Sequence, residues 1–206
     1  MEPLTVEVMV NAYASGYFPM ADPEEDDRIY WYKPEVRALL PLDEFHVPRR
    51  LARTMRQGRF QLRLDHDFEG VIRGCADRQE TWLSEEIIQV FLKLHAAGVA
   101  HAMGAYRSGT LVGGVYGLAL GSAFFAESMF QTERDASKVA LAGLVERLDG
   151  AGFTLFDVQF ASDHLKQFGL VEIPEDAYEV RLMSALGLSE ELGDSSVIQP
   201  GQDTNR

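Results

Sequence analysis

Polar side chains on two predicted strands are the first candidates for chemistry. The run Phe153 to Phe160 alternates as a strand does, which places Asp157 and Gln159 on one face. A carboxylate beside an amide can hold that amide in one orientation, as a reaction that depends on positioning requires. A hydrogen-bonded pair with a purely structural role, or a strand facing water, is the alternative at this point.

A second acidic group lies in the predicted strand Ala123 to Phe130. Alternation puts Glu127 on the same face as Phe125 and Met129, so a carboxylate stands between two bulky apolar groups. Such a face offers a hydrophobic recess and a negative charge to one ligand, which suits a substrate with an apolar end and a cationic end. An ordinary structural ion pair is the alternative interpretation.

The sequence lacks the signatures of several other catalytic sites. Ser128 does not lie in the glycine-flanked elbow of serine hydrolases. The five histidines show neither the HExxH spacing nor a Cys/His zinc pattern, and Cys75 is the only cysteine. A GxxxxGKS or GxxxxGKT loop for ATP is absent as well. We therefore expect no metal site, no internal disulfide and no cofactor.

The charge of the chain is unevenly distributed. A net charge of −13 argues against a broad nucleic-acid surface. The segment between Phe45 and Leu64, however, contains six arginines and no acidic residue. Contact with phosphates there would be salt-dependent, whereas a solvated helix face is the alternative. The six residues are Arg49, Arg50, Arg53, Arg56, Arg59 and Arg63.

Hydrophobic periodicity predicts an α+β architecture around these residues. Three antiparallel strands are expected between Val99 and Phe130, because two turns that contain glycine interrupt the run. Helices are expected before and after these strands. The order of elements is compatible with an acetyltransferase-like acyltransferase. The predicted helices cover Thr5 to Ser15, Ser84 to Gly98, the segment from Leu141 to Leu148, and Pro174 to Leu186.

Neither a membrane span nor a signal peptide is predicted. Glycines interrupt the apolar stretches well before the roughly 20 residues that a bilayer requires. The N-terminus begins Met-Glu-Pro and lacks a basic start and an apolar core. We expect a cytoplasmic protein and, because no extended apolar surface is evident, a monomer.

Short motifs distributed from Ala12 to Leu186 are specific in their order and spacing. They are Ala12-Tyr13-Ala14-Ser15-Gly16-Tyr17-Phe18-Pro19, Trp31-Tyr32-Lys33-Pro34-Glu35-Val36-Arg37, Gly74-Cys75-Ala76, Thr81-Trp82, Leu111-Val112-Gly113-Gly114-Val115-Tyr116-Gly117, Glu127-Ser128-Met129-Phe130, Ala136-Ser137-Lys138, Asp157-Val158-Gln159 and Asp163-His164. Together they resemble the bacterial leucyl/phenylalanyl-tRNA-protein transferases.

The resemblance implies a fold, a reaction and a set of partners. The fold would be a small N-terminal α/β domain, residues 1–62, packed on an acetyltransferase-like (GNAT-like) catalytic domain, residues 63–190, with the cleft between them. Residues 191–206 would be a disordered tail. The substrates would be Leu-tRNA or Phe-tRNA and a protein whose first residue is Arg or Lys. The product would enter N-degron proteolysis.

The resemblance also implies roles for individual residues. Glu127, Asp157 and Gln159 match the polar catalytic centre. We hypothesise that the Gln159 carbonyl accepts a hydrogen bond from the incoming α-amine, that Asp157 fixes the amide, and that Glu127 attracts the cationic substrate. Trp31 and Trp82 match tryptophans near the terminal adenosine of the tRNA, and the six arginines would contact its backbone. The aminoacyl pocket would be lined by Val115, Met129, Leu141, Leu144, Leu148 and Phe156.

Departures from the family pattern leave some alternatives open. Met20 stands where the family commonly has tryptophan, which leaves the contacts with the adenosine open. Val115 replaces a bulkier methionine, so the preference for leucine or phenylalanine stays undecided. An acyl-CoA acetyltransferase is disfavoured, because Gln131 to Ala136 lacks a glycine-rich pyrophosphate turn. A non-catalytic adaptor and a transferase for N-terminal Asp or Glu are the remaining alternatives, and the acidic site opposes the latter.

Overall fold

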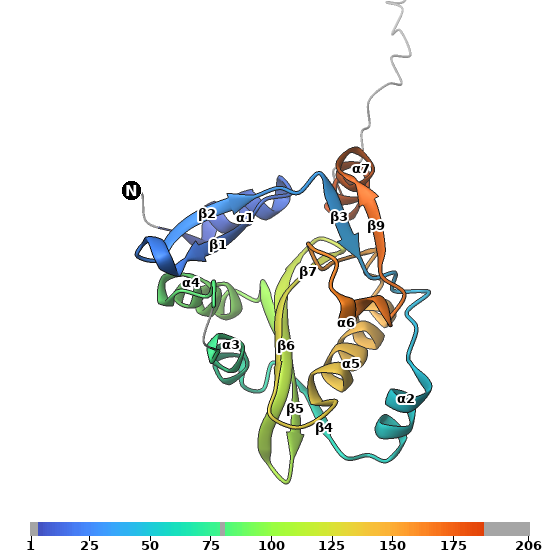
Figure 1. Ribbon diagram of the computed structural model, residues 1–206. Coiled ribbons are helices and arrows are strands. Elements are labelled where there is room, and N and C mark those ends of the chain that lie inside the picture. Colours follow the sequence, from blue (N-terminus) through green and yellow to red (C-terminus); the bar gives the residue numbers. More distant parts are fainter. Residues whose placement is uncertain (1–3, 79–80, 188–206) are drawn as a thin grey trace, which may run out of the picture.

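A seven-stranded sheet forms the centre of the molecule, in the strand order β4-β5-β6-β7-β8-β3-β9 (Figure 1). The computed structural model describes residues 4–78 and 81–187. Helices cover both faces of the sheet, and the predicted α+β class is confirmed. The segment 191–206, which we predicted to be disordered, lies outside the described residues.

One half of the sheet is an antiparallel meander, as the sequence predicted. The turn between β5 and β6 places Ser108 and Gly109 at positive φ, and the turn between β6 and β7 does so for Gly121. Tight hairpin turns require this conformation, so these residues determine where the strands end. The strands are β4 (Gln61–Leu64), β5 (Ala100–Arg107), β6 (Thr110–Leu120) and β7 (Ala123–Gln131).

The other half of the sheet joins segments that are distant in sequence. β8 pairs in parallel with β7 and antiparallel with β3, and β3 pairs antiparallel with β9. The predicted strand Phe153 to Phe160 was too long, because the chain turns away from the sheet at Gln159, which has a φ of 58°. The strands are β3 (Val36–Leu39), β8 (Leu155–Asp157) and β9 (Val171–Pro174).

The helices pack in two groups on opposite faces of the sheet (Figure 1). The four predicted helices are confirmed as α1, α4, α5 and α7. The side chains of Thr5 and Ser84 accept hydrogen bonds from the first turns of α1 and α4, as expected of N-caps. The helices are α1 (Val6–Ala14), α2 (Arg49–Arg56), α3 (Phe68–Ala76), α4 (Glu85–Ala96), α5 (Ala136–Gly150), α6 (Asp163–Lys166) and α7 (Glu175–Ala185).

α1 is followed by a small hairpin of β1 (Phe18–Asp22) and β2 (Arg28–Tyr32), with the short 3-10 helix η1 (Pro23–Glu25) between them. The Ala21 amide donates to the Trp82 carbonyl at 3.1 Å, which attaches this hairpin to the segment before α4. β3 follows at residue 36 and already belongs to the large sheet. The domain division at residue 62 stays a prediction. No helix within residues 4–78 and 81–187 is long and apolar enough to cross a membrane.

Candidate active site

β7 and β8 separate where the polar candidates lie. Their parallel pairing ends at Phe125 and Asp157. Beyond that point Ala126 pairs with Gly117 and Ser128 with Tyr116, so Glu127 is the extra residue of a β-bulge in β7. Past Phe125 and Asp157 the two strands no longer pair, which leaves a gap between them; Glu127 lies on β7 beside it, and Gln159 follows the end of β8 by two residues.

The bulge corrects the predicted face of β7. Phe125 packs against Tyr13 in the cluster beneath α1, α3 and α4, with ring centroids 5.2 Å apart. Met129 packs instead in the cluster beneath α5, on the opposite face of the sheet. The expectation that these two residues flank Glu127 on one face was wrong, because the extra residue shifts the alternation.

Gln159 lies in a strained turn rather than in a strand. The Phe160 amide donates to the Val158 carbonyl at 2.7 Å, which closes a three-residue turn around Gln159 at its φ of 58°. Non-glycine residues rarely adopt this conformation unless other contacts hold it. One such contact is present, since the Gln159 amide N–H donates to Asp157 Oδ1 at 2.8 Å. Asp157 therefore orients the backbone of Gln159, not its side-chain amide as we had hypothesised.

Asp157 is itself held by a sealed cluster of side chains. Arg37 donates to both of its carboxylate oxygens, with Nε at 2.9 and 3.0 Å and Nη2 at 2.7 Å. Tyr178 Oη donates to Oδ2 at 2.7 Å, and Arg37 Nη1 donates to the Gly16 carbonyl at 2.9 Å. Asp157 is 0% exposed and Arg37 1% exposed, so neither side chain can touch a substrate. Asp157 is a positioning residue.

Sequence analysis did not assign a role to Arg37 or Tyr178. A signal for Arg37 was present, because the residue stands in an apolar strand before Ala38 and Leu39. A buried arginine is tolerated only with an anionic partner. Burial acts to lower the pKa of Arg37, but the charge of Asp157, its hydrogen bonds with Arg37 and the nearby Tyr178 and Glu127 together raise that pKa.

Glu127 and Gln159 meet across the gap between the two strands. Gln159 Nε2 donates to Glu127 Oε1 at 3.2 Å. Burial raises the pKa of Glu127 to about 8, and the charge of Asp157 adds to this, while the Tyr13 hydroxyl and Arg37 oppose it. Glu127 therefore exchanges its proton near neutral pH, unlike an ordinary glutamate. Because Nε2 is bound to Glu127, the Gln159 carbonyl is the part of that amide that can accept a further hydrogen bond.

A cavity of about 250 Å³ lies beside this pair, and we call it the β7–β8 cavity. Five of the predicted site residues line it, which are Trp82, Val115, Glu127, Met129 and Leu141. Three residues predicted for the aminoacyl pocket lie in the core instead; they are Leu144, Leu148 and Phe156. Phe156 stacks there on Phe124, with ring centroids 5.6 Å apart. Trp31 is on β2 opposite Pro19 and does not line the cavity.

The cavity also has walls that sequence analysis did not identify. Phe160 lines the cavity and is 50% exposed. The Phe18 ring packs against it in an edge contact, with ring centroids 5.5 Å apart. Arg78 is held at the cavity by bonds to the Cys75 carbonyl and to Ser128 Oγ, of 2.8 and 3.0 Å. The remaining lining residues are Ala126, Ser128, Val158, Ser162, His164 and Leu165.

The six arginines of the predicted basic stretch lie on α2, on the loop after it and on β4. Arg49, Arg50, Arg53 and Arg56 lie on α2 with exposed side chains, and Arg59 follows in an exposed loop. Arg63, in β4, donates to Gln61 at 2.9 Å and contacts His66 at 2.9 Å, while its guanidinium lies over the Tyr106 ring. The side chain of Arg63 is thus engaged locally, whereas the arginines of α2 face solvent.

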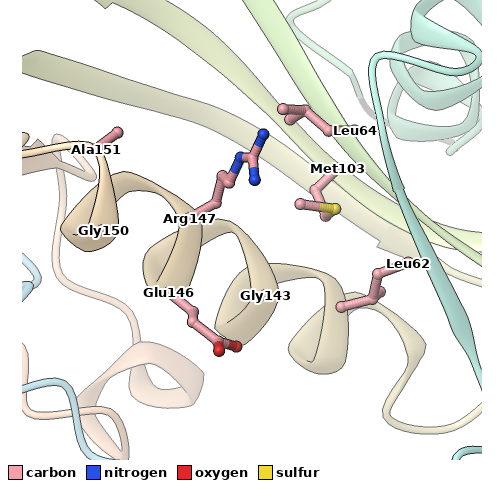
Figure 2. Close-up of a pocket in the computed structure, with 8 residues that line it drawn as sticks. All are labelled: Leu62, Leu64, Met103, Gly143, Glu146, Arg147, Gly150 and Ala151. Carbon is pink, nitrogen blue, oxygen red and sulfur yellow. The ribbon is translucent and has the colours of Figure 1, made fainter.

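A wider groove of about 690 Å³ lies between β4 and the C-terminal half of α5 (Figure 2). Its lining contains none of the predicted catalytic residues. Figure 2 shows Arg147 directed toward Leu64 and Met103, and Glu146 directed away from them. The groove offers no polar pair comparable to Glu127 and Gln159, so the β7–β8 cavity is the better candidate.

The family models and the sequence relatives point to the same family. The model of the leucyl/phenylalanyl-tRNA protein transferase family matches residues 39–183, and the model of its N-terminal domain matches residues 2–35. A leucyl/phenylalanyl-tRNA–protein transferase of Paramagnetospirillum magneticum is 53% identical over 190 residues, which cover 90% of this chain and 91% of that protein. The transferase of Gloeobacter violaceus is 52% identical over 185 residues, covering 90% and 95%.

Among solved structures, a GCN5-related N-acetyltransferase from Sphaerobacter thermophilus matches with a TM-score of 0.45 and 12% identity. The match covers 82% of this chain and 54% of that chain.

Proposed function

The chain belongs to the leucyl/phenylalanyl-tRNA protein transferase family, and we infer from this that it is an aminoacyltransferase. It moves leucine or phenylalanine from aminoacyl-tRNA to the α-amino group of proteins that begin with Arg or Lys, which marks them for N-degron proteolysis. The observation that carries the assignment of the site is the meeting of Glu127 and Gln159 beside one largely apolar cavity.

We propose that the β7–β8 cavity receives the aminoacyl side chain. Val115, Met129 and Leu141 supply apolar walls, and burial against them favours a hydrophobic group. Such walls discriminate only modestly between similar side chains, which fits a transferase that accepts both leucine and phenylalanine. Leu144, Leu148 and Phe156 would act from behind this wall, by determining how far the cavity extends toward the core.

We propose that Gln159 and Glu127 handle the acceptor amine. The aminoacyl ester is already activated, so the reaction needs only a neutral amine in the correct place. The Gln159 carbonyl would accept a hydrogen bond from the amine and align it with the ester carbonyl. The amine nitrogen then bonds to the ester carbon, the bond to the ribose oxygen breaks, and that oxygen leaves with the proton that the attacking nitrogen loses.

Glu127 is the group we propose to accept the proton of the incoming ammonium. It lines the cavity, and its pKa of about 8 is close to the roughly 7.7–8.0 of a free α-amine, so the proton transfer is nearly balanced. Asp157 is not suited to this role, because Arg37 and Tyr178 donate to its Oδ2, and Arg37 and the Gln159 amide donate to its Oδ1. Glu127 would also attract the cationic side chain of the acceptor when ionised.

Adenosine at the tRNA terminus would stack on aromatic walls of the cavity. Trp82 and Phe160 both line it, so we propose this pair as the stacking platform. The role of Trp31 beside them stays a prediction. The predicted arginines would supply backbone contacts. We further propose that the chain acts in the cytoplasm, where its aminoacyl-tRNA substrates are found. The monomeric state and the two domains stay predictions from the sequence.

A single transfer assay tests the function. Purified protein is mixed with labelled Leu-tRNA or Phe-tRNA and with peptides that begin with Arg, Lys, Asp or Ala. Transfer to the Arg and Lys peptides alone is expected. Transfer to the Asp peptide would mean a different acceptor class, and acetylation of the same peptides from acetyl-CoA would mean the acyl-CoA alternative. If no peptide received the amino acid, the non-catalytic adaptor would be the remaining interpretation.

A further inference from the structure

A second polar cavity, of about 260 Å³, lies between α2 and the N-terminus of α5. We call it the α2–α5 cavity. Arg50, Arg134 and Lys138 contribute cationic groups to its lining, and Asp135 contributes an acidic one. In a chain with a net charge of −13, this is a local excess of positive charge. Pro48, Leu51, Gln131 and Gln167 complete the lining.

The acidic groups near this cavity already have partners. Thr54 Oγ1 donates to Asp135 Oδ2 at 3.3 Å, which holds that carboxylate against α2. Glu133, in the same loop, forms an ion pair with Arg107. Asp135 keeps its charge, because a hydroxyl partner does not neutralise a carboxylate, so three cationic side chains and one carboxylate leave the cavity lining with a net charge of +2.

The N-terminus of α5 adds to the positive potential. Its N-cap residue, Asp135, has a φ of 71° and makes no side-chain capping bond, and the first turn of the helix contains no acidic residue. The free amides of a first turn and the helix dipole attract anions. An anion in the cavity would thus meet three cationic side chains and a helix N-terminus together.

The α2–α5 cavity and the β7–β8 cavity are neighbours. β7 contributes Met129 to the β7–β8 cavity and, two residues later, Gln131 to the α2–α5 cavity. α6 and the residue that follows it likewise contribute Leu165 to the first and Gln167 to the second. Burial lowers the pKa of His164 in the β7–β8 cavity, and the charge of Lys138 lowers it further, so Lys138 acts across the boundary.

We propose that the α2–α5 cavity binds backbone phosphates of the nucleotides that precede the terminal adenosine of the aminoacyl-tRNA. This proposal rests on the proposed function, which places that adenosine in the adjacent cavity. A phosphodiester is the anion that a single-stranded RNA end necessarily presents next to its last base. Arginine and lysine are the residues that contact it most often, with charge-assisted bonds that do not depend on base identity.

The test compares two donors that differ in these phosphates. Leu-tRNA carries them, whereas 3′-O-leucyl-adenosine ends at the terminal nucleoside and lacks them. The variants are Arg134→Gln, Lys138→Gln and the double variant, and the matched control is Lys93→Gln, an exposed lysine on α4. KM is measured for each donor with an Arg-initiated peptide, and the affinity for tRNA is measured between 50 and 300 mM salt.

The double variant is expected to raise KM for Leu-tRNA roughly tenfold or more, with each single variant giving a smaller rise. KM for leucyl-adenosine is expected to stay as in wild type. The slope of log affinity against log salt should become shallower by about 1.4, that is about 0.7 for each lost single-strand contact. Lys93→Gln should change neither quantity.

Three results would overturn the proposal. An equal loss with both donors would mean that the variants damage the catalytic cavity, and an unchanged salt slope would mean that no phosphate is bound here. A rise confined to the KM of the peptide would assign the cavity to the acceptor protein. Failure of the wild-type protein to use Leu-tRNA would instead contradict the proposed function, so the two failures are distinguishable.

Discussion

Two carboxylates that lie in adjacent elements of one site have opposite environments. Asp157 is sealed from solvent and bound by Arg37, Tyr178 and the Gln159 amide. Glu127 faces a cavity and is held there by a single amide hydrogen bond, at a pKa raised to about 8 by burial. The first carboxylate has a fixed charge and a fixed geometry, whereas the second can gain and lose a proton near neutral pH. When the surroundings of two acids give them different pKa values in this way, one acid can take a structural role and the other a proton-transfer role.

Replacement of Glu127 should have the largest effect on catalysis. Glu127→Gln keeps the size of the side chain but removes the group that accepts the proton, so kcat/KM for an Arg-initiated peptide should fall roughly 10²–10⁴-fold. Single-turnover transfer from Leu-tRNA measures this loss. Glu146→Gln, the same change at an exposed glutamate of α5 that does not line the β7–β8 cavity, is the matched control and should retain wild-type activity. A Glu127→Gln enzyme with wild-type kcat would remove Glu127 from the reaction.

Glu127→Gln should also change how the free energy of unfolding depends on pH, which a simple change in packing would not do. Because the pKa of Glu127 is raised from 4.5 to about 8, the folded chain keeps a proton between these values that the unfolded chain has released. The free energy of unfolding of the wild type therefore falls as pH rises from about 4.5 to about 8, and Glu127 causes no further loss above about 8. Glu127→Gln should therefore become more stable relative to wild type from pH 4 to pH 8. Urea unfolding at both pH values checks the sign.

Arg37 should matter most for stability. Arg37→Met leaves the buried charge of Asp157 without its partner, and such losses typically cost about 3–5 kcal/mol. The double variant Arg37→Met, Asp157→Asn removes both charges and should recover part of that loss, which a double-mutant cycle in urea measures. Arg73, whose ion pairs with Glu69 and Glu85 are exposed, supplies the surface control, and Arg73→Met should change stability little. If the two single losses simply added, Arg37 and Asp157 would not be coupled.

The contrast between the two carboxylates also separates what the sequence predicted from what it did not. Local signals sufficed for α1, α4 and the meander, because Thr5, Ser84 and the glycine turns act within a few residues. The residue types of the site could likewise be selected from motifs. Three features were out of reach: the bulge at Glu127, the early end of β8, and the pairing of Arg37 with Asp157 across 120 residues. Each is determined by tertiary contacts that periodicity does not encode.

The smallest expected effect tests whether the sealed cluster is structural alone. Tyr178→Phe removes one hydrogen bond to Asp157, while Arg37 and the Gln159 amide still hold the carboxylate. A hydrogen bond to a charged group contributes about 1.5–3 kcal/mol, so unfolding should become easier by at most that amount, with kcat nearly unchanged. Tyr106→Phe is the matched control, since the Tyr106 hydroxyl is buried and has no partner among the described residues. If Tyr178→Phe lowered kcat as far as Glu127→Gln does, Asp157 would take part in proton transfer, and the division of roles between the two carboxylates would be wrong.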